Sequence, residues 1–503
     1  MRNEDRIGNM ETLCDVLVIG GAFSGATTGL LLKQKLPDAR ILILEKSTEF
    51  DRKVGESTTE VSSCFLTRIL GVSTYLGQQH LAKQGLRLWF TNAPEQAFED
   101  CVEFGARYNS RLAGFQVDRS TLDEYLLQLA VEAGCELWRP AKVTGFECGG
   151  IGRNLVQVFK EDTTHRVRAK WVVDASGRAA VLARKMNHLK PLEAHPIHSL
   201  WGRFTGVKDW DGVELRKKFP VYANAVRTSR SGATNQLMGL GWWCWIIPLK
   251  GGDTSIGLVY DSRIYTPPEG NSISERLRAH FLKHPVGREL LGEVRPLLND
   301  QRAYSSLPYR SEKIVGDGWV LVGDAGSFID PMYSPGLDFC AFTSHAAHTL
   351  IARSLMGEEV SCADLEAYNN SFQNCYHSWF ETIYRDKYYY MGDAELMSAA
   401  FLLDIAMYHF GPVRQVFRNS DQNFSLFPFG GLTGKIVAKC MSFYNRRLVA
   451  LAHRKIASGC YGDRNSGWRL LVGGFVPDAG LLKLIGKGLF IWGRAELRCL
   501  LRF

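Results

Sequence analysis

A glycine-rich turn and a later acidic residue have the types and spacing needed to hold a nucleotide. Gly20, Ala22 and Gly25 follow an apolar, β-branched run and precede a stretch of helical composition. Gly20 permits a tight turn and Gly25 close helix–strand packing, so the helix N-terminus faces a pyrophosphate. Glu45 ends a second apolar run and can accept hydrogen bonds from a ribose. Ala22 occupies the position where a second glycine is usual. Its methyl group limits how closely the backbone can approach a phosphate.

Two later turns also end strand-like runs in an acid. Asp174 begins the turn Asp174-Ala-Ser-Gly177, and Gly323-Asp324 ends a buried run that starts at Trp319. Alone, Gly323-Asp324 is more often a strand-to-helix turn with a solvated carboxylate.

Other catalytic patterns are not completed by their neighbours. His195 and His198 have HxxH spacing, as do His345 and His348, but no cysteine or carboxylate cluster lies nearby to complete a metal site. No metal is predicted. The sequence also holds no GxSxG nucleophile turn and no P-loop.

These motifs, in this order and spacing, resemble the flavoprotein monooxygenase superfamily of the p-hydroxybenzoate hydroxylase type. Within it, the chain is similar to the flavin-dependent halogenases, over roughly residues 13–350. Val54-Gly-Glu-Ser57 looks like the GES loop that covers the flavin in halogenases and in geranylgeranyl-reductase-like enzymes. The resemblance implies FAD as the cofactor. It assigns FAD contacts to these residues: Gly20, Ala22, Gly25, Glu45, Gly55, Glu56, Ser57, Arg119, Asp174, Gly323, Asp324, Gly336 and Leu337.

Two features point to the halogenase branch. Trp243-Cys-Trp-Ile-Ile-Pro248 fits the family's WxWxIP pattern, and the resemblance places Trp243, Trp245 and Pro248 between the flavin and the organic substrate. Lys83 lies where halogenases have their essential lysine, which makes it the predicted catalytic residue. A desolvated lysine could hold hypohalous acid or form a haloamine. Without the neighbouring motifs, Lys83 would be taken for a surface charge.

The resemblance also places a halide site at Gly336 and Leu337, whose backbone N–H groups would bind chloride or bromide. Pro335, just before them, has no N–H to contribute. Tryptophan halogenases have a glutamate where Tyr333 stands, whereas phenol- and pyrrole-type relatives generally lack that acid. The expected substrate is therefore a phenol- or pyrrole-like aromatic, free or tethered to a carrier protein.

A second dinucleotide motif is not found, so we expect a separate reductase to supply FADH2. The alternatives are a flavin-dependent monooxygenase or a lipid-directed flavin reductase on the same fold. A third class, a flavin-binding protein without turnover, would make Lys83 and the tryptophan motif accidental.

The fold class expected from these elements is α/β: a Rossmann-like FAD-binding domain, an interleaved antiparallel substrate domain and a C-terminal helical region. The FAD-binding domain would span residues 13–190, with a substrate-domain insertion at about 86–110, and resume at 301–350. The antiparallel substrate domain would span 191–300, and 351–503 would be helical with a basic amphipathic tail. A helix is expected from about Ala341.

Composition limits the possible partners. The net charge is +8, but residues 431–503 hold thirteen Lys or Arg against three acids, so the main body offers no basic groove for nucleic acid. Twelve cysteines, none closer than thirteen residues to another, indicate a reduced cytoplasmic protein. The tail, residues 466–503, suits either peripheral membrane contact or a helix docked on the flavin domain with its basic face in water. Docking is the preferred interpretation.

Overall fold

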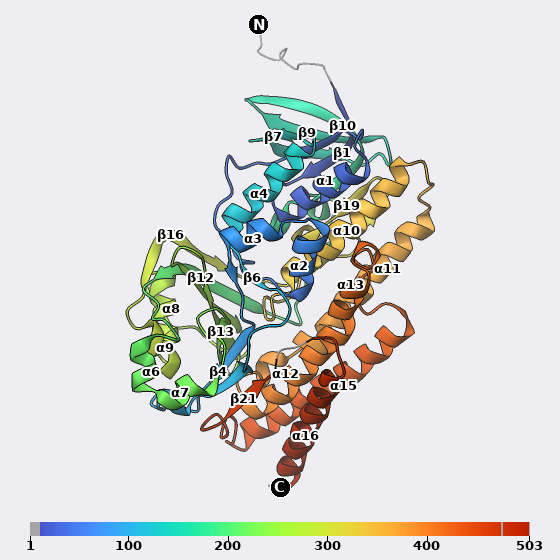
Figure 1. The fold of residues 1–503 in the computed structure, drawn as a ribbon. Helices are drawn as coiled ribbons and strands as arrows, with labels where there is room; N and C mark the ends of the chain where they lie inside the picture. The colour runs from blue at the N-terminus through green and yellow to red at the C-terminus, as the bar shows by residue number, and fades with distance from the viewer. Residues whose placement is uncertain (1–10, 474–475, 502–503) are drawn as a thin grey trace.

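The computed structural model describes residues 11–473 and 476–501. Its first sheet is built around parallel strands in the order β19-β10-β1-β2-β7, with β18 antiparallel at one edge and β8 and β9 continuing from β10. Helix α1 packs against both α4 and α10 (Figure 1). The bounds are β1 Thr12–Ile19, β2 Ile41–Leu44, β7 Glu136–Trp138, β8 Lys142–Glu147, β9 Asn154–Lys160, β10 Thr163–Asp174, β18 Val315–Gly316, β19 Trp319–Leu321, α1 Phe23–Lys35, α4 Arg119–Glu132 and α10 Gly336–Leu355.

The second sheet has the order β16-β12-β15-β14-β13-β4-β5-β21 and is mainly antiparallel. Helices α6 to α9 lie beside it (Figure 1). The bounds are β4 Leu86–Phe90, β5 Val102–Ala106, β12 Ile197–Thr205, β13 Thr234–Gly239, β14 Trp242–Pro248, β15 Thr254–Asp261, β16 Arg295–Tyr304, β21 Arg469–Val472, α6 Val213–Lys218, α7 Pro220–Ala225, α8 Ile273–Phe281 and α9 Pro285–Leu291.

Alternation along the second sheet separates two apolar cores. In β14, Trp243, Trp245 and Ile247 belong to the large core shared with the first sheet and the C-terminal helices. Cys244 and Ile246 point the other way, into a smaller core beneath α8 and α9. This is the period of two expected for a strand buried on both faces.

Short elements connect the two sheets. The segment after β2 forms α2 (Glu60–Cys64), the π-helical turn η1 (Phe65–Ile69) and α3 (Ser73–Gln79). Strand β3 (Leu81–Ala82) then pairs with β6 (Phe115–Gln116), which brings residues 81–85 beside the segment before α4. The remaining pieces are α5 Val181–Lys185 and a small sheet of β11 Leu189–Pro191, β17 Tyr309–Ser311 and β20 Ser327–Phe328.

The C-terminal third is mainly helical. Its elements are α11 Cys362–Trp379, η5 Phe380–Tyr384, α12 Ala394–Tyr408, η7 His409–Val413, α13 Arg414–Arg418, α14 Ser420–Asn423, α15 Gly431–Ala457 and α16 Gly480–Leu501. Among the described residues, the segment Ala394–Arg418 alone has the length and apolarity to cross a membrane, and 72% of its most apolar window is buried inside the protein. Helix α12 is thus surrounded by protein, as a core helix is.

Three expectations drawn from the sequence are wrong in detail. Helix α10 begins at Gly336 rather than near Ala341, because Pro335 fits a helix start, where no N–H is needed for the ladder. Residues 469–472 form β21 at the edge of the second sheet instead of continuing a helical tail, since Leu470 and Val472 alternate into the core.

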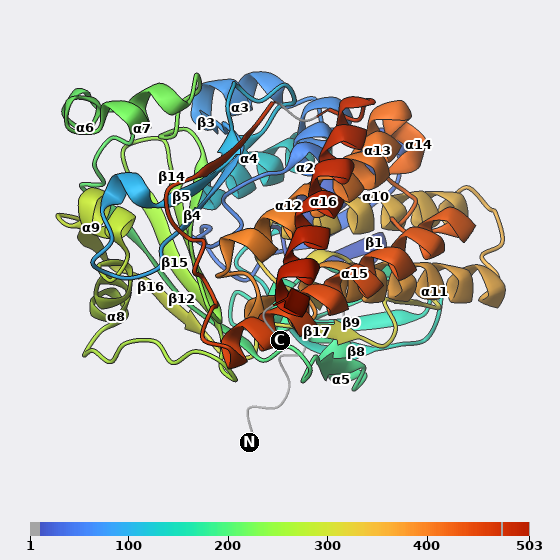
Figure 2. The ribbon, with the colours of Figure 1, turned by 90° about the horizontal axis from the view of Figure 1, so that it is seen from below.

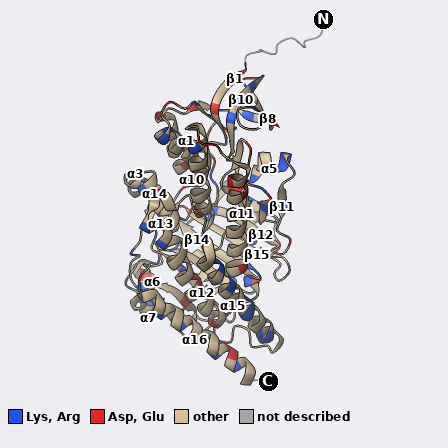
Figure 3. Cartoon of the chain, turned by 90° about the vertical axis from the view of Figure 1, so that its right-hand side faces the viewer, with Lys and Arg blue, Asp and Glu red and all other residues tan. Residues whose placement is uncertain are grey.

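The third correction concerns α16, which packs along α12 and α15 rather than on the flavin domain (Figure 2). Gly488 lies so close to α12 that an added Cβ would be 3.3 Å from the Ala399 carbonyl oxygen. Its outward side is not purely basic, because Phe490 is 64% exposed among the lysines and arginines of α15 and α16 (Figure 3). Membrane contact stays a prediction.

Candidate flavin site and active-site cavity

The first glycine turn has a geometry that only glycine tolerates. Gly20 has φ +98°, and a Cβ there would lie 2.5 Å from the Ala175 carbonyl oxygen. A Cβ on Gly25 would lie 1.8 Å from the Gly20 carbonyl oxygen. Ala22 precedes α1 and gives it no side-chain cap, so the first N–H groups of α1 keep the capacity to bind an anion.

Glu45 fastens this turn to the second strand. Its Oε2 accepts from the Gly21 N–H at 2.9 Å, and its Oε1 accepts from the Ser47 N–H and hydroxyl at 2.9 and 2.7 Å. A carboxylate has about four acceptor positions, so Glu45 can take a further donor such as a ribose hydroxyl. That role stays a prediction.

The acidic turns lie at the same edge of the sheet, because Ile19 pairs with Leu44 and with Asp174, and Asp174 pairs with Leu321. Asp174 is occupied by its own turn. Its two oxygens accept from the Ser176 and Leu182 N–H groups at 3.0 and 2.7 Å. The structure thus shows Asp174 bracing the backbone of the edge, whereas a direct contact to FAD is untested.

Asp324 differs from Asp174. Within the described part of the chain its carboxylate has no hydrogen-bond donor, and burial raises its pKa against the opposing charges of Arg178, Arg119 and Lys53. An added Cβ on Gly323 would lie 2.4 Å from Ser24 Oγ, so this turn sits against the start of α1. A half-buried acceptor without a protein donor, as Asp324 is, fits a polyhydroxyl ligand such as the ribityl chain of FAD. We refer to Gly20, Gly25, Glu45 and Asp324 as the flavin edge.

The GES loop is held from both sides. Arg119 binds Asp123 through Nε and NH2 at 3.0 and 3.1 Å, and a Cβ on Gly55, which has φ +95°, would lie 2.6 Å from its NH1. Glu56 is buried and accepts from Arg203 at 2.8 and 3.1 Å. Burial raises the pKa of Glu56 to about 7, against the charge of Arg203. The side chain of Glu56 therefore ties the loop to the second sheet.

Ser57 completes this attachment, because its Oγ lies 3.0 Å from Thr234 Oγ1 on β13. The side chains of Glu56 and Ser57 are hydrogen-bonded to other protein groups, and these bonds hold the loop in place. Only the loop backbone would then be available for a contact to FAD. The assignment of Gly55, Glu56, Ser57 and Arg119 as cofactor-binding residues is untested by this geometry.

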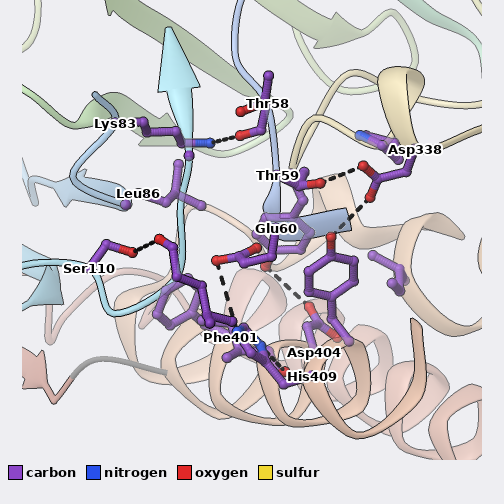
Figure 4. A pocket seen from close by; sticks show the side chains of 18 of the residues that line it. Thr58, Thr59, Glu60, Lys83, Leu86, Ser110, Asp338, Phe401, Asp404 and His409 are labelled. Carbon is purple, nitrogen blue, oxygen red and sulfur yellow. Dashed lines mark hydrogen bonds and ion pairs between the residues drawn. The ribbon is translucent and has the colours of Figure 1, made fainter. Parts of the chain in front are cut away.

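A cavity of about 140 Å³ lies beside the GES loop, between the β3–β4 connection, the start of α10 and helix α12 (Figure 4). Its lining residues are Thr58, Thr59, Glu60, Lys83, Gly85, Leu86, Ala106, Ser110, Leu112, Ala113, Gly114, Tyr333, Pro335, Asp338, Trp379, Ile383, Tyr384, Phe401, Asp404, Ile405, Tyr408 and His409. The wall is mostly apolar, with a few polar groups converging on it, as in small-molecule sites.

Lys83 lies in this cavity, and its Nζ donates to the Thr58 carbonyl oxygen at 2.7 Å. Burial lowers its pKa to about 8, against the opposing carboxylates of Glu60 and Asp338. Near neutral pH a fraction of Lys83 would thus be an uncharged amine, the form of a lysine that can act as a nucleophile. The catalytic role of Lys83 stays a prediction.

The predicted halide residues open α10. Gly336 and Leu337 are its first two residues, where backbone N–H groups have no partner within the helix. Asp338 follows them and faces the cavity, with its carboxylate accepting from Thr59 Oγ1, the Ser62 N–H and Tyr408 Oη. Burial raises the pKa of Asp338 to about 6. Halide binding at Gly336 and Leu337 stays a prediction.

The tryptophan motif does not line this cavity. Trp243 Nε1 donates to Tyr388 Oη at 3.0 Å, and Tyr388 donates to Asp330 Oδ2 at 3.1 Å. Trp245 Nε1 donates to Ser255 Oγ at 3.1 Å, and Pro248 closes β14. The two indoles lie in the core that both sheets share, and a role as a barrier between flavin and substrate is untested.

The histidines of the two HxxH pairs have partners within the protein. His195 Nε2 lies 2.8 Å from Asp330 Oδ2, and the His198 ring stacks on Tyr260 with ring centroids 5.4 Å apart. His345 Nδ1 contacts Ser425 Oγ at 2.8 Å. No group of three potential metal ligands is found among residues 11–473 and 476–501.

Sequence reasoning missed one wall of the cavity, which comes from α12 and η7. Asp404 binds the buried Lys387 ammonium at 2.5 Å and accepts from Tyr333 Oη at 3.1 Å. Tyr408 and His409 follow on the same segment. Asp404, Tyr408 and His409 lie beyond position 350, where the recognised motifs end. They belong to an apolar helical stretch whose composition is that of an ordinary buried core.

The comparison with known families agrees with this architecture. A sequence profile described as tryptophan halogenase matches residues 106–392, more than half of the chain. The chain belongs to this family. The description names the family rather than the substrate of this member.

Curated relatives include flavin-dependent halogenase chlA of Dictyostelium discoideum, 27% identical over 356 residues that cover 64% of this chain and 57% of the relative. Monodechloroaminopyrrolnitrin halogenase PrnC of Pseudomonas fluorescens is 25% identical over 405 residues, 73% of this chain and 68% of the relative. A 1H-pyrrole-2-carbonyl-(peptidyl-carrier protein) chlorinase of Pseudomonas fluorescens is 24% identical over 389 residues, which cover 73% of this chain and 82% of the relative. The chain therefore matches little more than half the length of the first.

Solved structures give the same fold. Halogenase PltM in complex with phloroglucinol and FAD has a TM-score of 0.74 at 16% identity, covering 96% of this chain and 98% of that one. Flavin-dependent brominase Bmp2 has a TM-score of 0.64 at 20% identity, covering 87% of this chain and 100% of that one. The predicted family, fold class and FAD cofactor are confirmed, and the flavin edge fits that cofactor through its glycine turn and the free acceptor of Asp324.

Proposed function

We propose that this protein halogenates an electron-rich aromatic substrate, phenol- or pyrrole-like, using FADH2, O2 and chloride or bromide. The observation that carries the proposal is Lys83, an amine with a pKa of about 8 inside an apolar cavity beside the GES loop. Bound reduced flavin supplies, with O2, the oxidising equivalent that converts halide to hypohalous acid. A separate reductase would supply the reduced flavin.

Lys83 would direct the electrophile. Its bond to the Thr58 carbonyl fixes the position of Nζ, and its lowered pKa gives both a protonated form that donates to hypohalous acid and a neutral form that reacts with it. Either form keeps the halogen close to the ring, which raises the local concentration of the reactants.

The apolar wall would hold the aromatic ring. Leu86, Trp379, Ile383, Tyr384 and Phe401 are among its apolar and aromatic lining residues. An engineered cavity of about 150 Å³ binds a single benzene in another protein, so about 140 Å³ suits one substituted ring. A carrier-tethered substrate would place only its ring here.

The relatives support the substrate class without fixing it. Their printed names include a pyrrole chlorinase acting on a carrier-bound substrate and an enzyme crystallised with phloroglucinol. Tyr333, whose hydroxyl binds Asp404, occupies the position of the glutamate of tryptophan halogenases, which disfavours indole chemistry by their mechanism.

The experiment supplies FADH2, O2 and bromide to the purified protein with a panel of phenols, pyrroles and indoles, and identifies products by mass. Brominated product that disappears when bromide is omitted supports the proposal. Oxygenated product formed equally with and without bromide would overturn it in favour of a flavin monooxygenase, and product lacking both bromine and added oxygen would favour a reductase.

A further inference from the structure

A glutamate and a histidine meet in the cavity, and neither has a role in the chemistry assigned so far. Glu60 is the first residue of α2, directly after the segment that holds Lys83, and His409 is the first residue of η7. Glu60 Oε1 and His409 Nε2 lie 3.9 Å apart (Figure 4). Both side chains line the cavity that contains Lys83.

The orientation of His409 is fixed by its other nitrogen. Nδ1 lies 3.0 Å from the Ile405 carbonyl oxygen, which can only accept, so Nδ1 carries a proton. Nε2 is therefore the ring atom that gains or loses a proton. A histidine held in one tautomer by a carbonyl on its other ring nitrogen can act as a general base.

The distance leaves room for a third group. At 3.9 Å, Glu60 and His409 are beyond the usual 2.7–3.2 Å of a hydrogen bond. A carboxylate oxygen and an unprotonated imidazole nitrogen are both acceptors, so a hydroxyl entering beside them could donate to either.

We propose that the Glu60–His409 pair removes the hydroxyl proton of a phenolic substrate, and hence that the substrate is a phenol rather than a pyrrole or an indole. This inference rests on the proposed halogenation. Figure 4 shows Lys83, Glu60 and His409 reaching the cavity from different elements, so a ring bound in the cavity would meet both the pair and the residue that directs the electrophile.

The step balances as follows. The phenol O–H bond breaks and its proton moves to His409 Nε2. A ring carbon of the phenolate donates an electron pair to the halogen of hypohalous acid, so a carbon–halogen bond forms and the halogen–oxygen bond breaks. The hydroxide leaves as water with a proton from Lys83. The ring C–H proton then returns to Lys83 through water, and His409 returns its proton to the phenol oxygen.

Ionisation matters because a phenolate ring attacks electrophiles much faster than the neutral phenol. A positioned general base contributes about 10²–10⁴ in rate. Neither a methyl ether nor a pyrrole offers a phenolic proton, so neither would use the pair.

The test compares wild type, His409→Asn and Glu60→Gln as FAD holoenzymes given FADH2, O2 and bromide. Substrates are resorcinol, its dimethyl ether and 2,3,5,6-tetrafluorophenol, which is ionised at assay pH and keeps one ring C–H, para to the hydroxyl. Each variant should brominate resorcinol about a hundredfold more slowly, at the general-base magnitude. The bromination rate of each variant should stay within about threefold of the wild-type rate for the tetrafluorophenol and for the ether, since neither needs the base.

His409→Asn is the decisive variant, because Glu60 also acts electrostatically on Lys83. His453→Asn, on the exposed side of α15, is the matched control and should behave as wild type. FAD affinity and thermal stability are measured for every variant, and Glu60→Gln stands in if His409→Asn does not fold.

Equal losses on all three substrates would show a structural role and overturn the inference, as would no loss on resorcinol. Pyrrole brominated by wild type as fast as resorcinol would overturn the assignment of substrate class. Absence of any bromination by wild type would instead refute the proposed function, so the two failures are distinguishable.

Discussion

The flavin edge and the cavity beside it are constructed in different ways. The flavin edge depends on backbone geometry within short segments, where Gly20 and Gly25 allow contacts that no side chain would permit. The cavity depends on buried charges that join distant segments. Asp338 meets Thr59 across 279 positions, and Asp404 meets Lys387 and Tyr333. Each turn of the cofactor site is thus recognisable within its own short segment, whereas the residues of the substrate site are brought together only by the completed fold.

The substitution with the largest expected effect is one that disrupts the flavin edge alone. Gly25→Ala places a Cβ 1.8 Å from a backbone carbonyl, a clash that no side-chain rotation relieves. We expect loss of FAD binding and a cost of about 4 kcal/mol or more in the free energy of unfolding. FAD fluorescence titration and denaturant unfolding measure both.

Gly77→Ala in α3 is the control, because a Cβ there meets nothing within 4 Å. It should leave FAD affinity unchanged and add slightly to stability, through better helix propensity. Normal FAD binding by Gly25→Ala would show that this turn does not position the cofactor.

The second largest effect is expected from a substitution that disrupts the cavity alone. Lys387→Met leaves the carboxylate of Asp404 buried without its ammonium partner, which should cost about 3–5 kcal/mol in the free energy of unfolding. FAD affinity of the folded fraction should stay at the wild-type value, since the flavin edge is untouched. Denaturant unfolding and FAD titration again give the two numbers.

The double variant Lys387→Met, Asp404→Asn removes both charges and should recover part of the stability, because no unpaired charge remains. If the double variant were less stable than the single one by the full cost of a second independent change, the two residues would not act as a pair.

A smaller effect tests the ligand of the flavin edge. Asp324→Ala removes a half-buried acceptor to which the described protein offers no donor. FAD affinity should fall by about 1.5–3 kcal/mol, with little change in the free energy of unfolding. Asp317→Ala, exposed just before the other end of β19, is the matched control. Unchanged FAD affinity in Asp324→Ala would contradict the assignment of Gly323-Asp324.

The same contrast explains what the sequence could and could not predict. The glycine turn, Glu45 and Gly323-Asp324 are contiguous patterns with one physical solution, so their place at the carboxyl edge of the sheet could be inferred. Lys83 was found because it lies between two such motifs. Its environment in the cavity could not be read from its neighbours in the chain.

The missed residues share a cause. Asp404 and His409 lie in a helical segment whose composition is that of buried core, and only the packing of α12 against the loop before α2 brings them to Lys83. Glu60 lies in a recognised region but has no partner within its own segment that would mark it. The sequence predicts a helix from about Ala341, whereas α10 begins at Gly336, directly after Pro335, a residue that suits a helix start.

Lys83 carries the central claim and gives its most direct test. With FADH2, O2, bromide and a phenol, Lys83→Ala and Lys83→Arg are compared with wild type for FAD affinity, O2 consumption and brominated product. We expect normal FAD affinity and O2 consumption in both variants but no carbon–bromine bond, because alanine cannot hold the electrophile and a guanidinium cannot become a neutral amine. Brominated product at the wild-type rate from either variant would contradict the account.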